Sequence, residues 1–257
     1  MHVQRLEQAY RPSPAARRLA GTRLWNSPSL GADEQRALED IASSPRSVRA
    51  NTDIIREGAP ADSLFVVLDG WAFRYATTRE GGRQIPALLL PGDTCNLDSL
   101  MLDRLDYGVR TITDATVVSL PRDRAVALAA QHPGIARTFT CAAIVENAVL
   151  SAWMLSLARR PSKERLAHLL CELNARLGVE HDNRSHFAFP MTQEQLADAL
   201  GLTPVHVNRT MQQLRYDGLV ESERRTLVLP DVAALRRVAG FNPRYLHADS
   251  PPYARCA

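Results

Sequence analysis

The sequence predicts an α+β protein in which an antiparallel β domain precedes a group of helices. Two observations carry this prediction. Between residues 48 and 120, short apolar runs alternate with Gly, Pro and Asp at intervals of roughly ten residues, which is typical of an antiparallel sandwich or small barrel. From residue 122 onward, apolar residues recur at three- and four-residue steps, which is typical of helices. The 257 residues, 45% hydrophobic and 23% charged, have the composition of a globular protein.

The N-terminal half is expected to contain an extension and the β domain. Residues 1–30 are basic and polar, and we expect them to form the extension. The β domain is expected over residues 31–132, beginning with a short helix at 32–43. Its turns include Asp69-Gly70 and Gly81-Gly82, which suit two-residue hairpins because glycine accepts a positive φ.

A long apolar helix is predicted next, over residues 133–158. At 1.5 Å per residue it would span roughly 39 Å. A helix with so few charges needs apolar partners on more than one side, either within its own chain or from a second copy. No uninterrupted apolar run approaches the ~20 residues of a membrane helix, so we expect no membrane partner.

Residues 159–240 are expected to form a C-terminal domain and residues 241–257 a tail, and the residues after Leu235 carry no readable signal. We expect Ser162 to N-cap the first helix of this domain and Gly178 to end it. The polar residues 179–185 are expected to form a loop.

The most specific motif is a helix-turn-helix. Thr192 with Gln195 three residues later forms a capping box, and the helix that it begins ends at Gly201. Thr203 then N-caps a second helix, and two short strands within residues 219–229 follow as a hairpin. Two helices joined by a tight turn through glycine, followed by a hairpin with a basic tip, predict a winged helix-turn-helix.

The second helix is expected to be the recognition helix of a DNA-binding domain. Arg209 suits guanine O6 and N7, and Asn208 or Gln212 suits adenine N6 and N7. Amides and hydroxyls at helix N-termini suit phosphate, and the hairpin arginines suit the DNA backbone. The predicted DNA contacts are Thr192, Gln193, Thr203, Pro204, Val205, His206, Asn208, Arg209, Gln212, Arg224 and Arg225.

Charge and composition agree with this prediction and exclude several enzyme classes. Residues 159–257, with 14 Lys/Arg and 11 Asp/Glu, hold the whole net charge of +3. A cupin-like metal barrel is excluded because no histidine lies between His2 and His132. No GxSxG, GxxxxGK[ST] or GxGxxG occurs. The four cysteines form no CxxC pair, so we expect no metal, no cofactor and a reducing, cytoplasmic compartment.

The chain resembles the Crp/Fnr family of bacterial transcription regulators in three segments, which follow one another in the family's order. They are IIREGAPADSLFVVLDGWAFRY (54–75), LLLPGDTCNLDSL (88–100) and the helix-turn-helix. The resemblance covers most of residues 30–235. It implies a cyclic-nucleotide-binding-like β-roll (a double-stranded β-helix), a long dimerisation helix and a winged helix-turn-helix. It also implies a homodimer on near-palindromic DNA and, for an activator, contact with RNA polymerase. The dimer contact would then use Phe139, Ala142, Val145, Val149, Ala152 and Trp153.

The chain departs from the sensor sites of that family. Members that bind cyclic AMP carry a Gly-Glu-Leu step and an Arg-Ser pair, where this chain has Asn96-Leu97-Asp98 and Tyr107-Gly108. Iron–sulfur members use an N-terminal cysteine cluster, and no cysteine precedes Cys95. The glutamate often found early in the recognition helix is Val205 here. An effector pocket, if there is one, is expected at Asn96, Leu97, Asp98, Ser99, Tyr107, Gly108 and Arg110.

Two interpretations of the β domain stay open. It is either the sensor of a small-molecule signal or the scaffold of a regulator that needs no effector. A cyclic-nucleotide-responsive regulator and a thiol redox sensor are weaker alternatives. A cavity around residues 96–99 and 107–110 would favour the sensor, whereas large side chains filling that space would favour the scaffold.

Overall fold

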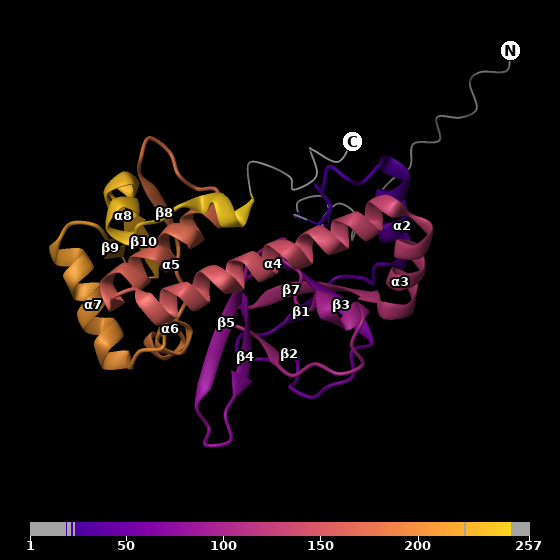
Figure 1. The fold of residues 1–257 in the computed structure, drawn as a ribbon, viewed down its shortest axis with the longest axis horizontal. Helices are drawn as coiled ribbons and strands as arrows, with labels where there is room; N and C mark the ends of the chain where they lie inside the picture. The colour runs from indigo at the N-terminus through magenta and orange to yellow at the C-terminus, as the bar shows by residue number, and fades with distance from the viewer. Residues whose placement is uncertain (1–18, 20–21, 23, 224, 248–257) are drawn as a thin grey trace, which may run out of the picture.

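The computed structural model describes residues 19, 22, 24–223 and 225–247. Two β-sheets and a helical domain with a small sheet of its own are joined by the long helix α4 (Pro133–Arg159), which runs across the molecule between them (Figure 1). Most of the predicted extension at 1–30 and part of the predicted tail at 241–257 lie outside the described residues, as does Arg224.

The predicted antiparallel β domain is confirmed. One sheet has the strand order β1-β7-β3 and the other β2-β6-β4-β5, and the strands pair antiparallel. The prediction of a two-residue hairpin at Asp69-Gly70 is wrong, because β3 and β4 belong to different sheets. Gly70 has φ +82°, and a Cβ there would lie 2.3 Å from the carbonyl oxygen of Asp114, so only glycine fits this turn between the sheets. The other predicted turn does connect a hairpin, β4–β5, but through the five residues 78–82. The strands are β1 (Arg46–Val48), β2 (Asp53–Ile55), β3 (Ser63–Asp69), β4 (Ala72–Thr77), β5 (Arg83–Leu89), β6 (Gly108–Thr111) and β7 (Ala115–Pro121).

Three short helices cover the β domain: α2 (Ala32–Ile41), the 3-10 helix η1 (Leu97–Leu100) and α3 (Arg122–Gln131). Leu24 and Trp25 of the predicted extension are buried in the same apolar cluster as Leu38 of α2. Ile135 and Phe139 in the first turns of α4 belong to the same cluster, so the described end of the extension packs against α4. Helix α2 is also bonded to α4, because Gly134 N–H donates to the Glu34 carboxylate at 2.8 Å.

The C-terminal domain contains more structure than the sequence predicted. The strand β8 was not predicted, and helices α8 and η2 lie in or next to the stretch where no signal was found. Pro161, and not Ser162, is the N-cap of α5. The elements are α5 (Ser162–Leu177), β8 (Ser185–Ala188), α6 (Gln193–Leu200), α7 (Pro204–Tyr216), β9 (Glu221–Glu223), β10 (Thr226–Leu229), α8 (Val232–Ala239) and η2 (Pro243–Leu246).

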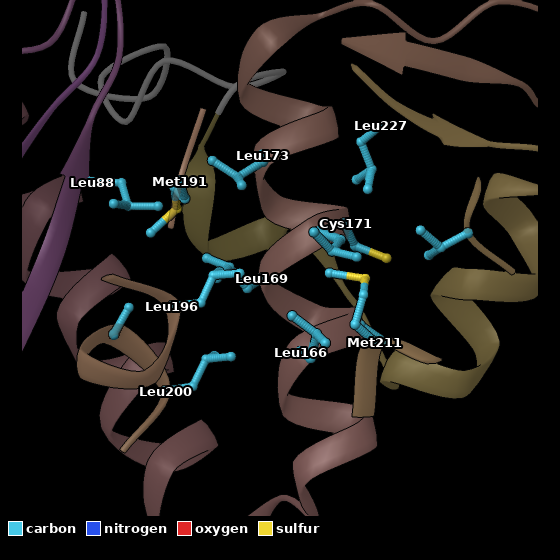
Figure 2. Close-up of a cluster of buried hydrophobic side chains, with 14 of the residues drawn as sticks. Leu88, Leu166, Leu169, Cys171, Leu173, Met191, Leu196, Leu200, Met211 and Leu227 are labelled. Carbon is cyan, nitrogen blue, oxygen red and sulfur yellow. The ribbon is translucent and has the colours of Figure 1, made fainter. Parts of the chain in front are cut away.

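One continuous apolar cluster joins the β domain to the C-terminal domain. Leu88 of β5 packs in the same cluster as Met191 and Leu196 (Figure 2). Two ion pairs border this junction: Arg83 of β5 contacts Asp198 of α6 at 2.6 Å, and Arg176 of α5 contacts Asp93. The orientation of the helix-turn-helix is therefore tied to β5 by both packing and charge.

Helix α4 is long and apolar enough, by length and composition alone, to cross a membrane. Arg137 and Glu146 interrupt this helix, so the expectation that no uninterrupted apolar run approaches the length of a membrane helix is not contradicted. One such helix is weak evidence for a membrane, and its middle is anchored within the protein, where Glu146 pairs with Arg74 of β4 at 2.9 Å. Only 11% of the residues in its most apolar window are buried within the chain, and the others are half-buried or exposed.

Candidate DNA interface and sensor region

The two helices of the helix-turn-helix are capped by local hydrogen bonds and by a glycine, as the sequence predicts. Gln195 N–H donates to the Thr192 hydroxyl at 3.1 Å, and Thr192 N–H donates to the Gln195 side chain at 2.9 Å. Gly201 ends α6 with φ +60°. His206 N–H donates to the Thr203 hydroxyl, so α7 begins one residue later, at Pro204.

The inner face of α7 explains an unusual residue in the motif. Val207, Thr210, Met211 and Leu214 are buried at the three- and four-residue steps of one helix face. Thr210 occupies a position where an aliphatic residue would pack. Its hydroxyl donates to the His206 carbonyl at 2.8 Å, so the buried polar group is satisfied within the helix.

The outer face of α7 carries side chains that are free to bind a ligand. Arg209 and Gln212 are exposed, Asn208 is half-buried, and Val205 is 70% exposed. None of these four side chains has a hydrogen bond or ion pair within the described part of the chain. A row of uncommitted arginine and amide groups on an exposed helix suits base edges in a major groove.

Other predicted contacts already have roles inside the protein. The Thr192 and Thr203 hydroxyls accept hydrogen bonds as helix caps, and each keeps its own proton for a phosphate oxygen. The Nε2 atom of His206 lies 3.0 Å from the Ser162 hydroxyl at the start of α5. Gln193 is exposed at the first turn of α6.

The hairpin forms a three-stranded wing in the order β8-β10-β9. Arg225 is exposed near its tip, and its carbonyl accepts from Phe189 N–H at 2.8 Å. The prediction for Arg224 lies outside the described residues. Arg215 was missed, although it continues the exposed face by a three-residue step from Gln212. Its guanidinium donates to Ser222 of the wing at 2.8 Å, which links the recognition helix to the hairpin.

The predicted effector pocket is filled by protein groups. Asn96 is buried, and its amide accepts from Phe65 N–H at 2.9 Å and donates to the Ser63 carbonyl at 3.0 Å. Leu97 and Ser99 are buried on η1. Asn96 therefore holds β3 in place, and none of these three residues lines the large cavity of the structure.

The space beside them holds a network of aromatic and charged side chains. Tyr107 donates to Asp98 at 2.5 Å, and the Arg74 guanidinium lies 5.3 Å from the centre of the Tyr107 ring. Burial raises the pKa of Tyr107. Arg74 is buried and also donates to the Cys95 carbonyl at 2.6 Å and to Glu146 at 2.9 Å. Its positive charge is therefore neutralised within the protein.

The second half of the predicted pocket is closed in the same way. A Cβ at Gly108 would lie 2.4 Å from the Tyr75 ring, so Tyr75 covers the glycine. Arg110 donates to both oxygens of Asp53, at 2.7 and 3.0 Å, and this hydrogen bonding is the main reason why the pKa of Asp53 is lowered. An arginine held in this way does not offer its charge to a phosphate. None of the seven predicted effector residues lines a cavity of about 580 Å³ that lies elsewhere, between β5 and α4.

The thiol redox alternative loses support at Cys95 and Cys171. Burial raises the pKa of Cys95 and of Cys171 to about 12, which keeps both thiols protonated and unreactive. Within the described residues, no group of three or more His, Cys, Asp or Glu is placed to hold a metal ion.

The face of α4 assigned to a dimer contact needs correction. Phe139 and Trp153 are buried within the chain, and Trp153 Nε1 donates to Glu172 at 2.8 Å. Ala142, Val145, Val149 and Ala152 are half-buried on the faces turned toward the chain. The exposed apolar residues of α4 are instead Ile144, Leu150, Met154 and Leu155.

Comparison with known proteins matches both halves of the chain. The family described as a cyclic nucleotide-binding domain matches residues 45–132, and the Crp-like helix-turn-helix domain matches residues 164–238. The chain is 29% identical to the nitrogen fixation regulation protein FixK of Azorhizobium caulinodans over 90% of this chain and 93% of the relative. It is 25% identical to the transcriptional activator protein FnrA of Stutzerimonas stutzeri over 82% and 87%. The structure of FixK2 from Bradyrhizobium japonicum is similar with a TM-score of 0.71 at 28% identity, covering 77% of this chain and 98% of that one.

Proposed function

Because the chain belongs to the Crp/Fnr family of transcription regulators, we propose that it acts on near-palindromic DNA as a homodimer. The observation that carries this proposal is the outer face of α7. There, Arg209, Asn208 and Gln212 are uncommitted, while the caps and core of the motif are complete. A two-fold dimer would place two such helices roughly 34 Å apart, in successive major grooves.

The exposed side of α4 supports the dimer. Ile144, Met154 and Leu155 are more than half exposed in a single chain. They lie on the same side of the helix, since steps of three and four residues connect them through Asn147 and Ser151. Exposed apolar residues that form one stripe mark an interface, and a parallel α4 of a second copy is the partner that the family suggests. The proposed dimer contacts are therefore these residues and not Phe139 or Trp153.

The closed effector region favours a regulator that binds DNA without a cyclic nucleotide. Arg74 and Arg110 are both neutralised by carboxylates, and Tyr75 and Tyr107 fill the space. Relatives named as transcriptional activators support activation through contact with RNA polymerase, which would take place in the cytoplasm.

Selection of random double-stranded DNA by the purified protein, without any added effector, tests the proposal. We expect enrichment of one two-fold symmetric site. Met154→Glu places a charge in the α4 stripe, and we expect it to give a monomer in sedimentation and to lose the selected site. Val126→Glu, at an exposed apolar residue of α3, is the matched control and should remain a dimer. Selection of asymmetric sites, or a Met154→Glu dimer with full affinity, would contradict the proposal.

A further inference from the structure

Helix α7 lies at one end of the molecule (Figure 1), and its second residue is an exposed valine. Val205 is 70% exposed, whereas the apolar side chains of α7 between residues 207 and 214 are buried. Within the described part of the chain, Val205 belongs to none of the apolar clusters that form the core. Its apolar surface is therefore available to whatever α7 binds.

Val205 shares one helix face with the side chains that are proposed to read base edges. Asn208, Arg209 and Gln212 follow it at steps of three, four and seven residues, which place side chains on the same side of a helix. The next residue, His206, is instead engaged within the protein, since its Nε2 atom lies 3.0 Å from a hydroxyl of α5. Val205 is therefore the apolar member of an otherwise polar face.

The composition of α7 determines which bases this face can distinguish. Residues 204–216 contain no Asp or Glu, and a carboxylate is the usual acceptor for the N4 amino group of cytosine. In the major groove, thymine is the base that presents an apolar group, its C5 methyl. Contact between this methyl and a valine removes the apolar surface of both from water. A polar base edge against the valine would lose water without gaining a hydrogen bond, so the face favours a thymine opposite Val205.

We propose that Val205 selects a thymine in each half-site of the DNA by contact with the thymine methyl group. This inference rests on the proposed function and adds an apolar contact to the hydrogen bonds of Arg209 and Asn208. Val205 precedes Arg209 by four residues, or about 6 Å along the helix, and successive bases of one strand are about 3.4 Å apart. The selected thymine should therefore lie within about two base pairs of the base that Arg209 reads.

Deoxyuridine in place of thymidine tests the contact, because it removes the methyl group and leaves the base pairing unchanged. The duplexes are the selected site and versions of it in which one thymine of each half-site is replaced in turn. Their affinity for the full chain is read from the fluorescence anisotropy of a labelled strand. For one thymine we expect the affinity to fall about fourfold for each half-site, or about fifteenfold in all, which is the effect of one buried methyl group.

Substitutions of Val205 separate its contact from other effects of the methyl group. Val205→Ala should bind the thymine and deoxyuridine duplexes with affinities within about twofold of each other, because the partner of the methyl group is gone. Val126→Ala shortens an exposed valine of α3 and is the matched control, which should keep the full difference between the two duplexes. Val205→Glu supplies a carboxylate, so a repeated selection should replace this thymine with cytosine.

Several results would overturn the proposal. These are equal affinity of the wild type for all thymine and deoxyuridine duplexes, an undiminished difference in Val205→Ala, or thymine retained in the site that Val205→Glu selects. An undiminished difference would mean that another residue or the bending of the DNA reads the methyl group.

The failure of this proposal is distinguishable from the failure of the proposed function. A two-fold symmetric site whose affinity does not depend on thymine methyl groups removes the role of Val205 alone. The absence of any selected site removes the proposed function and, with it, this contact.

Discussion

The arginines at the junction of the β domain and those of the helix-turn-helix are used in opposite ways. Arg74 is buried, the side chain of Arg176 is only 7% exposed, and each is bound by a carboxylate and a backbone carbonyl. Arg209 is exposed, and its side chain has no partner in the described part of the chain. An arginine that already has a partner within the protein therefore stabilises the fold, whereas an arginine without such a partner is available to DNA. Its presence in a motif does not distinguish the two.

Loss of Arg176 is expected to have the largest effect. Arg176→Met leaves the buried Glu172 and the half-buried Asp93 without their cation, so we expect the free energy of unfolding to fall by about 3–5 kcal/mol. Urea denaturation measures this loss. Arg36→Met, which breaks an exposed pair with Asp33, is the control and should cost less than about 1 kcal/mol. A similar small cost for both variants would remove the contrast between buried and exposed arginines.

A buried histidine of the C-terminal domain should make the stability of the protein depend on pH. His168 is 4% exposed between Phe241 and Tyr245, and burial lowers its pKa to about 4. Below pH 6.5 the unfolded chain binds a proton that the folded chain does not, so the stability that neutral His168 retains at higher pH is lost as pH falls from 6.5 to 4. The expected contribution is about 1.4 kcal/mol per pH unit at most. His168→Phe should flatten the pH dependence of the unfolding free energy, and an unchanged slope would contradict this role.

Arg209→Ala should affect DNA and leave stability nearly unchanged. We expect the affinity for the selected site to fall by about 1–3 kcal/mol and the preference at one base pair to relax. The free energy of unfolding should change by less than about 0.5 kcal/mol, because the side chain is exposed and has no partner. Competition between the selected duplex and its single-base variants measures the preference. Unaltered base preference would exclude direct readout by Arg209.

Arg225→Ala is expected to have the smallest and most general effect. An arginine of the wing that contacts phosphate should weaken binding to all sequences alike and lower the slope of log K against log salt by about one. Titrations of the selected and an unrelated duplex at several salt concentrations measure this slope. A loss confined to the selected duplex would mean that Arg225 reads bases.

Local signals in the sequence predicted the DNA-binding motif well because caps act over three or four residues. Thr192, Gln195 and Gly201 perform the roles that their spacing predicts. Helix α8 carries a comparable signal, since Asp231 accepts from Ala234 N–H at 2.8 Å, and this signal was overlooked.

Contacts between distant residues were not predictable in the same way. The closed effector region depends on Arg74 and Glu146, which are 72 residues apart. The burial of Phe139 and Trp153 within the chain was not predictable, because apolar residues lie on more than one side of α4. Packing against β5 and α5 decides which side is covered, and periodicity does not show this packing.

We infer that the β domain is closed to cyclic nucleotides, while the exposed face of α7 is free to bind DNA. The decisive measurement is the affinity of the purified protein for its selected duplex with and without millimolar cyclic AMP. We predict the same affinity in both conditions, because Arg74 and Arg110 are held by Glu146 and Asp53. A tightening of about tenfold or more on addition of the nucleotide would contradict the account.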